Sequence, residues 1–210
     1  MREFIEIKAN AISIGNRTLV SGYGINDSDY QTKIIINGKR VECPVYRKWH
    51  SMLNRCYSDK YQARYPTYIG ATVCKDWMTF SVFKDWMEKQ DWQGKELDKD
   101  IIVAGNRMYS PDTCCFVPRA LNLLLTDRGA TRGDYPQGVS FDKWHEQYKA
   151  YCSYEGKQKH LGYHSAVEGA STVYRKYKHA LVRKIASEQT DPRIMRGLVI
   201  HADLILRGES

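Results

Sequence analysis

The sequence predicts an α+β fold whose second half is a three-stranded antiparallel sheet packed on one helix. In residues 147–153 polar and apolar side chains alternate, which is typical of a strand with one buried face. After a turn at 154–156 the alternation resumes in 157–164, so the two segments form a hairpin. From Ser165 onward apolar residues recur at helical spacing, and this helix is expected to cover the apolar face of the sheet.

The helix is expected to begin with a capping box formed by Ser165 and Glu168. Its inward stripe is expected to consist of Val167, Ala170, Val173, Tyr174 and Tyr177. One helix covers only one side of a sheet, so the other side would be free. Six cationic and aromatic side chains are expected together on that free side: Lys143, Trp144, Lys149, Tyr151, Lys157 and Lys159.

Positive charge is concentrated in this part of the chain. Residues 128–187 contain 11 Lys and Arg against 5 Asp and Glu, so this segment holds +6 of the total net charge of +8. Such a distribution is typical of a polyanion-binding surface. A narrow antiparallel ribbon also fits the DNA major groove, with cations on phosphates. We therefore expect these six residues to bind double-stranded DNA, with single-stranded RNA as a competing partner.

Residues 135–186 resemble the APETALA2-type DNA-binding domain of plant ethylene-response factors and phage homing endonucleases. The resemblance is carried by Gly138-Val139, Tyr148-Lys149-Ala150, Gly156-Lys157, Leu161-Gly162-Tyr163 and Val173-Tyr174. Two positions depart from the family: His164 stands where Phe is usual, and Gly169 where Glu or Ala is usual. A glycine inside a helix costs roughly 1 kcal/mol. The resemblance implies DNA binding through the sheet.

Composition sets the remaining limits. The chain has 210 residues, 42% of them hydrophobic, which suffices for one medium domain or two small ones. No apolar run approaches the roughly 20 residues of a membrane span, and the first residues do not read as a signal peptide. We expect no membrane partner and a location in the cytoplasm of a bacterial or phage-infected host cell. The six cysteines are scattered without a C-x-x-C pair, so zinc is not expected.

Before the sheet, we expect a β-rich extension over residues 1–43, with a hairpin turn at 36–40, and then a body over 44–128. In the body, Trp49, Met52, Leu53 and Cys56 follow helical spacing. A second helix, capped by Thr79 or Ser81, carries a stripe of Phe80, Phe83, Trp86 and Met87.

Residues 97–127 predict a strand at 97–101, a turn-rich connection, a returning strand at 114–117 and a helix opened by Pro118. From residue 46 to 122 the chain resembles phage HNH-type homing endonucleases, mobile-element enzymes with a ββα-metal body and an appended APETALA2-type domain. The shared residues are Trp49, Met52, Arg55-Cys56-Tyr57, Val73-Cys74, Trp77, Phe80, Phe83, Leu97-Asp98, Tyr109-Ser110-Pro111, Cys114 and Asn122.

The HNH resemblance implies a nuclease site but leaves its activity open. Asp98 matches the family's metal ligand and Asn122 its later asparagine, while Lys99 stands where the catalytic histidine belongs. A lysine is protonated at neutral pH, so it does not act as a general base. Asp100 would point to the same side of a regular strand as Asp98, and two carboxylates can hold Mg²⁺.

Two interpretations follow from these residues. One is a DNA-binding protein on a nuclease-derived body. The alternative is an active endonuclease of homing type, and only then would Mg²⁺ be a cofactor.

A short joint is expected at 129–134, because two glycines, a threonine and charged residues favour a mobile connection. After it, residues 187–210 are expected to form a helical tail that starts at Pro192. Its inward residues would be Ile194, Leu198, Ile205 and Leu206. We expect this tail to pack on the body or on a partner chain.

Overall fold

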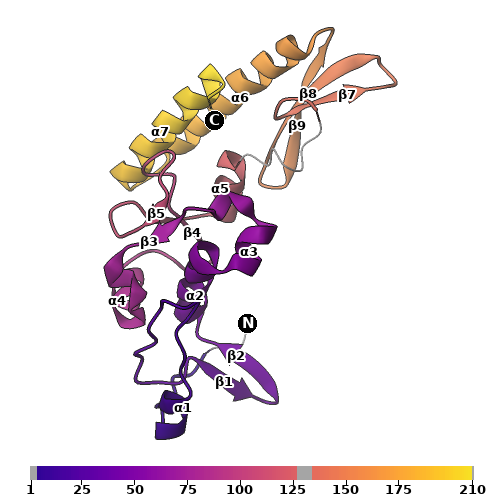
Figure 1. Cartoon of the computed structure of the whole chain (residues 1–210). Coiled ribbons are helices and arrows are strands. Elements are labelled where there is room, and N and C mark those ends of the chain that lie inside the picture. Colours follow the sequence, from indigo (N-terminus) through magenta and orange to yellow (C-terminus); the bar gives the residue numbers. More distant parts are fainter. Residues whose placement is uncertain (1–3, 127–133, 210) are drawn as a thin grey trace. The chain divides into compact units, whose positions relative to one another are not determined.

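The computed structural model describes residues 4–126 and 134–209, which form two compact units (Figure 1). The N-terminal unit runs to Gln93 and includes Asn106–Phe116, and the C-terminal unit consists of Gly94–Gly105 and the chain from Val117 onward. Both units contain helices and strands, so the α+β class is confirmed. The division differs from the expected boundaries, because 94–105 groups with the C-terminal unit. Apart from Asp134, the expected joint at 129–134 lies outside the described residues.

The first part of the N-terminal unit contains a hairpin of β1 (Lys33–Ile36) and β2 (Lys39–Glu42). Asn37 and Gly38 both have positive φ, which is typical of a two-residue hairpin turn, so the predicted turn is confirmed. A helix that the sequence did not predict, α1 (Ala11–Gly15), precedes the hairpin. Asn10 accepts a hydrogen bond from the Ser13 amide, and this cap stabilises the single turn.

The rest of the N-terminal unit consists of short elements around two helices. These are α2 (Pro44–Tyr57), α3 (Asp59–Arg64), the 3-10 turn η1 (Pro66–Tyr68), β3 (Thr72–Val73), the 3-10 turn η2 (Lys75–Met78), α4 (Phe80–Met87), β5 (Met108–Tyr109) and β6 (Cys115–Val117), whose last residue belongs to the C-terminal unit. β3 and β5 pair in parallel. The connection before the returning strand thus contains a strand that the sequence did not predict.

Aromatic side chains hold α2 against α4. The rings of Trp49 and Phe80 lie 5.3 Å apart, and the Trp49 indole donates to the carbonyl oxygen of Trp77 over 2.7 Å. All four residues of the predicted α2 stripe are buried, so this helix is confirmed. Gly24 lies so close to Trp49 and Leu53 that no side chain would fit there.

The cap of α4 comes from a distant segment. Thr79 occupies the N-cap position, but its side chain makes no capping hydrogen bond. Instead, the Asp27 carboxylate accepts hydrogen bonds from the amide and the hydroxyl of Ser81. A carboxylate at a helix N-terminus is favourable both as an acceptor and through the helix dipole.

The C-terminal unit is built on a sheet and two long helices. Its elements are β4 (Glu96–Asp98), α5 (Arg119–Leu125), β7 (Val139–Asp142), β8 (Gln147–Tyr154), β9 (Lys157–His164), α6 (Val167–Ser187) and α7 (Pro192–Arg207). The three strands β7, β8 and β9 form one antiparallel sheet in that order, which confirms the predicted sheet. Glu155 and Gly156 make the tight turn between β8 and β9 with positive φ.

Helix α6 packs on one face of the sheet, as predicted. Val139, Ala150 and Ala170 form the buried centre of this contact. Gly138 has positive φ and lies against the Tyr174 ring, so a side chain at this position would collide with it. The predicted capping box is wrong: α6 begins after Ala166, and no side chain caps it.

Helix α7 packs on α6 of the same chain (Figure 1). Asp203 forms an ion pair with His179 over 3.4 Å, and Arg175 donates to the carbonyl oxygen of Leu206. Ile194, Leu198 and Ile205 are buried as predicted. The inward position predicted for Leu206 is wrong, since its side chain is exposed. None of the described helices is both long and apolar enough to cross a bilayer.

Candidate nucleic-acid interface

The strand register assigns side chains to the two faces of the sheet. Residues directly opposite each other on paired strands share a face. Lys149 lies opposite Ser140 and Tyr163, and Tyr151 lies opposite His160. Their neighbour Ala150 points the other way, into the contact with α6. We call the side away from Ala150 the outer face; it consists of Ser140, Asp142, Gln147, Lys149, Tyr151, Ser153, Gln158, His160 and Tyr163.

The expectation that Lys157 and Lys159 share this face with Lys149 is wrong. Lys157 pairs with Tyr154 and Lys159 with Cys152, so both lie on the face of Ala150. The cause is a β-bulge in β9 beside Ala150 and Tyr151, where the register shifts by one residue. A one-residue shift moves each side chain in the strand beyond the bulge to the opposite face of the sheet. Both lysines are exposed near the tip of the hairpin.

A glycine permits this bulge. Gly162 has φ of 113°, which residues with a side chain rarely adopt, and it lies at the register shift. Leu161, the extra residue, packs against the core beneath the sheet. The sequence places Leu161-Gly162 in an otherwise alternating strand, and an isolated glycine in a strand is the signal that could have indicated a bulge.

A row of rings crosses the outer face. The Tyr163 ring lies 4.3 Å from the His145 ring and 4.8 Å from the His160 ring, measured between centroids. The Tyr163 hydroxyl donates to Asp142 over 3.4 Å. None of these four residues was predicted as a site residue. The hairpin pattern does not show that His145 of the β7–β8 turn folds back onto the sheet, or that the register shift in β9 brings His160 to this face.

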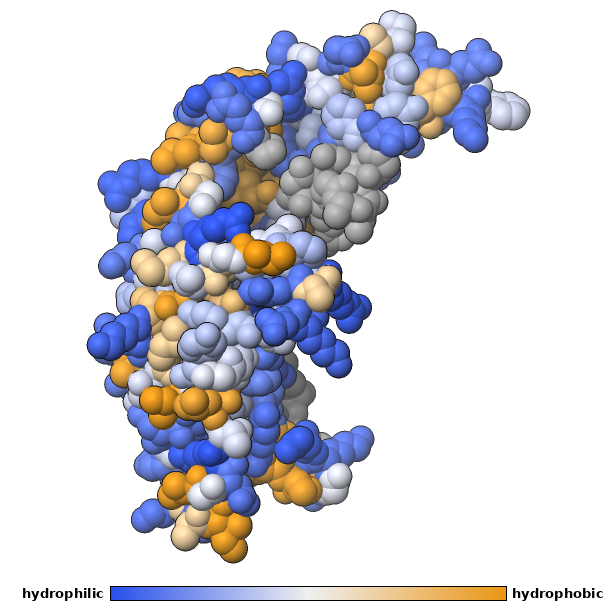
Figure 2. All heavy atoms as spheres, in the orientation of Figure 1, coloured by the Kyte–Doolittle hydropathy of each residue, from blue (hydrophilic) through white to orange (hydrophobic). Residues whose placement is uncertain are grey.

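Asp142 fixes the turn that follows β7. One oxygen of its carboxylate accepts hydrogen bonds from the amides of Trp144 and His145, over 3.0 and 3.1 Å. These hydrogen bonds, above all those from His145, lower the pKa of Asp142. Lys143 and Trp144 stand at the outside of this turn, and Trp144 is 90% exposed. Around β7–β9 the molecular surface is predominantly hydrophilic with a few apolar side chains (Figure 2).

One of the positive charges of this segment lies inside the unit. Lys178 of α6 is buried, donates to the Gln137 side chain over 2.9 Å and stands 5.7 Å from the centre of the Tyr174 ring. A buried ammonium needs polar partners of this kind. The net charge of the segment therefore overstates the charge available on its surface.

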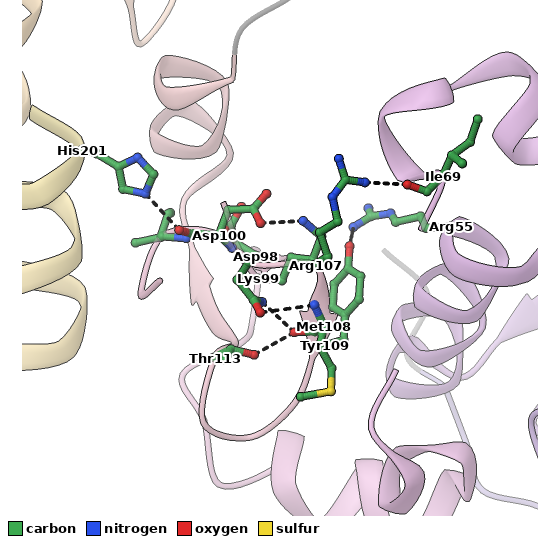
Figure 3. A network of polar contacts seen from close by, with 12 residues as sticks. Arg55, Ile69, Asp98, Lys99, Asp100, Arg107, Met108, Tyr109, Thr113 and His201 are labelled. Atoms are coloured by element: carbon green, nitrogen blue, oxygen red, sulfur yellow. Dashed lines mark hydrogen bonds and ion pairs between the residues drawn. The ribbon is translucent and has the colours of Figure 1, made fainter. Parts of the chain in front are cut away.

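Three residues of the predicted nuclease site, Asp98, Lys99 and Asp100, lie together where β4 ends and the chain turns (Figure 3). Strand β4 ends at Asp98, whose Oδ1 accepts hydrogen bonds from the amides of Asp100 and Ile101 over 2.7 and 2.8 Å. Lys99 forms an ion pair with Asp100. The strand predicted through residue 101 is therefore wrong, and strand alternation does not place Asp98 and Asp100 on one side. Burial raises the pKa of Asp98.

Helix α7 supplies a histidine beside this turn. The Nε2 atom of His201 lies 2.9 Å from the carbonyl oxygen of Asp100 (Figure 3). Asn122 lies half-buried on α5, and no hydrogen bond joins its side chain to Asp98 within residues 4–126 and 134–209. In those same residues, no three His, Cys, Asp or Glu side chains gather as a metal-binding group.

Comparison of the chain with protein-family models, with curated proteins and with solved structures finds no match.

Proposed function

We propose that the protein binds double-stranded DNA through the outer face of its three-stranded sheet and the adjoining turn 143–146. The observation that carries this proposal is the position of Lys149 and Tyr151. Both lie on the face opposite to the contact with α6. Lysine and tyrosine side chains on such a ribbon can reach phosphates, sugars and base edges in the major groove.

The outer face is held in shape before DNA arrives. Helix α6 packs on its reverse side, and Asp142 fixes the turn that presents Trp144. Side chains that are already ordered lose little conformational entropy on binding. Tyr163, whose ring contacts the rings of two histidines, adds a planar ring next to Lys149.

Lys157 and Lys159 have a different part in this proposal. They project from the reverse face near the hairpin tip, so they contact flanking phosphates rather than base edges. Their contribution is therefore expected to be smaller and independent of DNA sequence.

The test compares two variants that lose the same charge. Lys149→Gln, on the outer face, and Lys157→Gln, on the reverse face, are titrated with a labelled duplex by fluorescence anisotropy at several salt concentrations. We expect Lys149→Gln to reduce the slope of log K against log salt by about 0.9, as for one lost phosphate contact, and Lys157→Gln to reduce it less. If Lys149→Gln changes neither affinity nor slope, the outer face is not the binding surface. If single-stranded RNA competes better than the duplex, the partner is RNA.

One observation favours keeping the endonuclease alternative. His201 brings an imidazole to the Asp98–Asp100 turn, where the sequence has Lys99 in place of the histidine. The test is digestion of plasmid DNA with Mg²⁺ by the native chain and by Asp98→Asn. Cutting by the native chain that Asp98→Asn abolishes supports a nuclease. Equal cutting by both, or none by either, rules out metal-dependent cleavage through Asp98.

A further inference from the structure

Two arginines of the N-terminal unit converge on the same short segment. Arg107 donates from Nη1 to the carbonyl oxygen of Ile69 over 2.5 Å. The Arg55 guanidinium lies 5.6 Å from the ring centre of Tyr68, the residue before Ile69. It also donates to the Tyr109 hydroxyl over 3.5 Å. Figure 3 shows the two arginines with Ile69 and Tyr109.

The pairing of β3 with β5 brings the two guanidinium groups to one side. Thr72 donates its amide to the carbonyl oxygen of Arg107, which continues β5 backward by one residue. Residues two apart in an extended strand point to the same side, so Arg107 and Tyr109 project together. Arg55 reaches this side from α2 and contacts Tyr109 there.

Among the residues that the structure describes, the hydrogen bonds of both guanidinium groups go to neutral oxygens. Burial raises the pKa of Tyr109, so its hydroxyl is uncharged at neutral pH and supplies Arg55 with no counter-charge. The Nε atom of Arg55 is buried, and it has no hydrogen-bond partner in the part of the chain that the structure describes. Buried charges in proteins are normally paired, and a buried donor without a partner is costly.

From this arrangement we infer a phosphate-binding site at Arg55 and Arg107, bordered by Tyr68 and the Ile69 carbonyl. Guanidinium groups bind phosphate oxygens with two parallel hydrogen bonds, and a phosphate placed here supplies the missing counter-charge. The inference that this phosphate belongs to the DNA backbone rests on the proposed function. A DNA phosphate bound at Arg55 and Arg107 would be a second contact with DNA, on the N-terminal unit and separate from the sheet. A free phosphate ion has the same chemistry and is the other possible source.

The experiment changes Arg107, whose side chain is exposed, so that the fold is kept. Arg107→Gln is compared with Arg64→Gln, which changes an exposed arginine of α3 whose guanidinium lies 5.4 Å from the ring centre of Tyr65. Duplex affinity is measured against salt. We expect Arg107→Gln to lower affinity about three- to ten-fold and the salt slope by about 0.9, and Arg64→Gln to change neither.

A second measurement separates the sources of phosphate and does not depend on DNA binding. The melting temperature of the native chain is measured in inorganic phosphate and in sodium chloride of equal ionic strength. If phosphate raises it for the native chain but not for Arg107→Gln, while duplex affinity is the same for both, the ligand is a free phosphate ion. If Arg107→Gln matches the native chain in both measurements, the inference is overturned, whether or not Lys149→Gln still weakens DNA binding.

Discussion

Replacing Asp98 by asparagine should leave the protein as stable as before or make it more stable. Asp98 Oδ1 accepts two backbone amides, and the side-chain oxygen of asparagine can accept both. The carboxylate also carries a charge whose burial is unfavourable, and this burial raises the pKa of Asp98. Asparagine keeps the hydrogen bonds and removes the charge.

The matched variant Asp98→Ala is expected to be less stable than the native chain. It leaves the amides of Asp100 and Ile101 without their acceptor. An unsatisfied buried amide costs about 1–3 kcal/mol, so the loss of both acceptor contacts should reduce the free energy of unfolding by about 2–6 kcal/mol. Urea denaturation followed by circular dichroism measures both variants against the native chain.

The pH dependence of the free energy of unfolding provides a second test of the role of Asp98. Because the folded pKa of Asp98 is raised, the native state binds the proton more tightly than the unfolded state. Protonated Asp98 contributes its full stabilisation of the native state at pH values below its pKa in the unfolded chain. This stabilisation is lost as the pH rises through the pKa of Asp98 in the folded protein. The advantage of Asp98→Asn over the native chain should therefore grow from pH 4 to pH 7. If Asp98→Asn is destabilised as much as Asp98→Ala, or its advantage is constant with pH, the reasoning is wrong.

Two further predictions concern packing and the binding turn. Gly197→Ala should lower the free energy of unfolding by about 1–3 kcal/mol, because the added methyl group would collide with the carbonyl of Ile101. The control, Gly169→Ala on α6, has its nearest neighbour at 3.8 Å and should be neutral or stabilising by up to about 1 kcal/mol, and equal losses in the two variants would contradict the close contact. Asp142→Ala should accelerate hydrogen exchange at the amide of Trp144 and weaken duplex binding, whereas Asp142→Asn, which keeps the acceptor oxygen, should do neither. Slow exchange in Asp142→Ala would show that another group holds the turn.

Periodic segments could be predicted from the sequence, because burial imposes the period. The α2 stripe, the hairpin of β8 and β9 and the covering helix α6 all follow from apolar spacing. On α7, Ile194, Leu198 and Ile205 were predicted inward and are buried, whereas Leu206, also predicted inward, is exposed.

The features that the sequence did not predict depend on contacts between distant residues or on one local irregularity. Asp27 caps a helix 54 residues away, and no local pattern identifies that partner. Asp98 ends its strand because its carboxylate accepts amides of the following turn. The bulge at Gly162 shifts the register of β9 by one residue. Lys157 and Lys159 therefore lie on the face opposite to the one that strict alternation predicts.

The most direct measurement is an NMR footprint of a bound DNA duplex on the isotopically labelled 210-residue chain. If the sheet binds as proposed, the largest changes on adding duplex fall on Lys149, Tyr151 and Tyr163 and on the indole of Trp144. Residues beneath the sheet, such as Ala170 on α6, then shift little. Changes confined to the exposed sides of α6 and α7, with Lys149 and Tyr151 unaffected, would contradict the account.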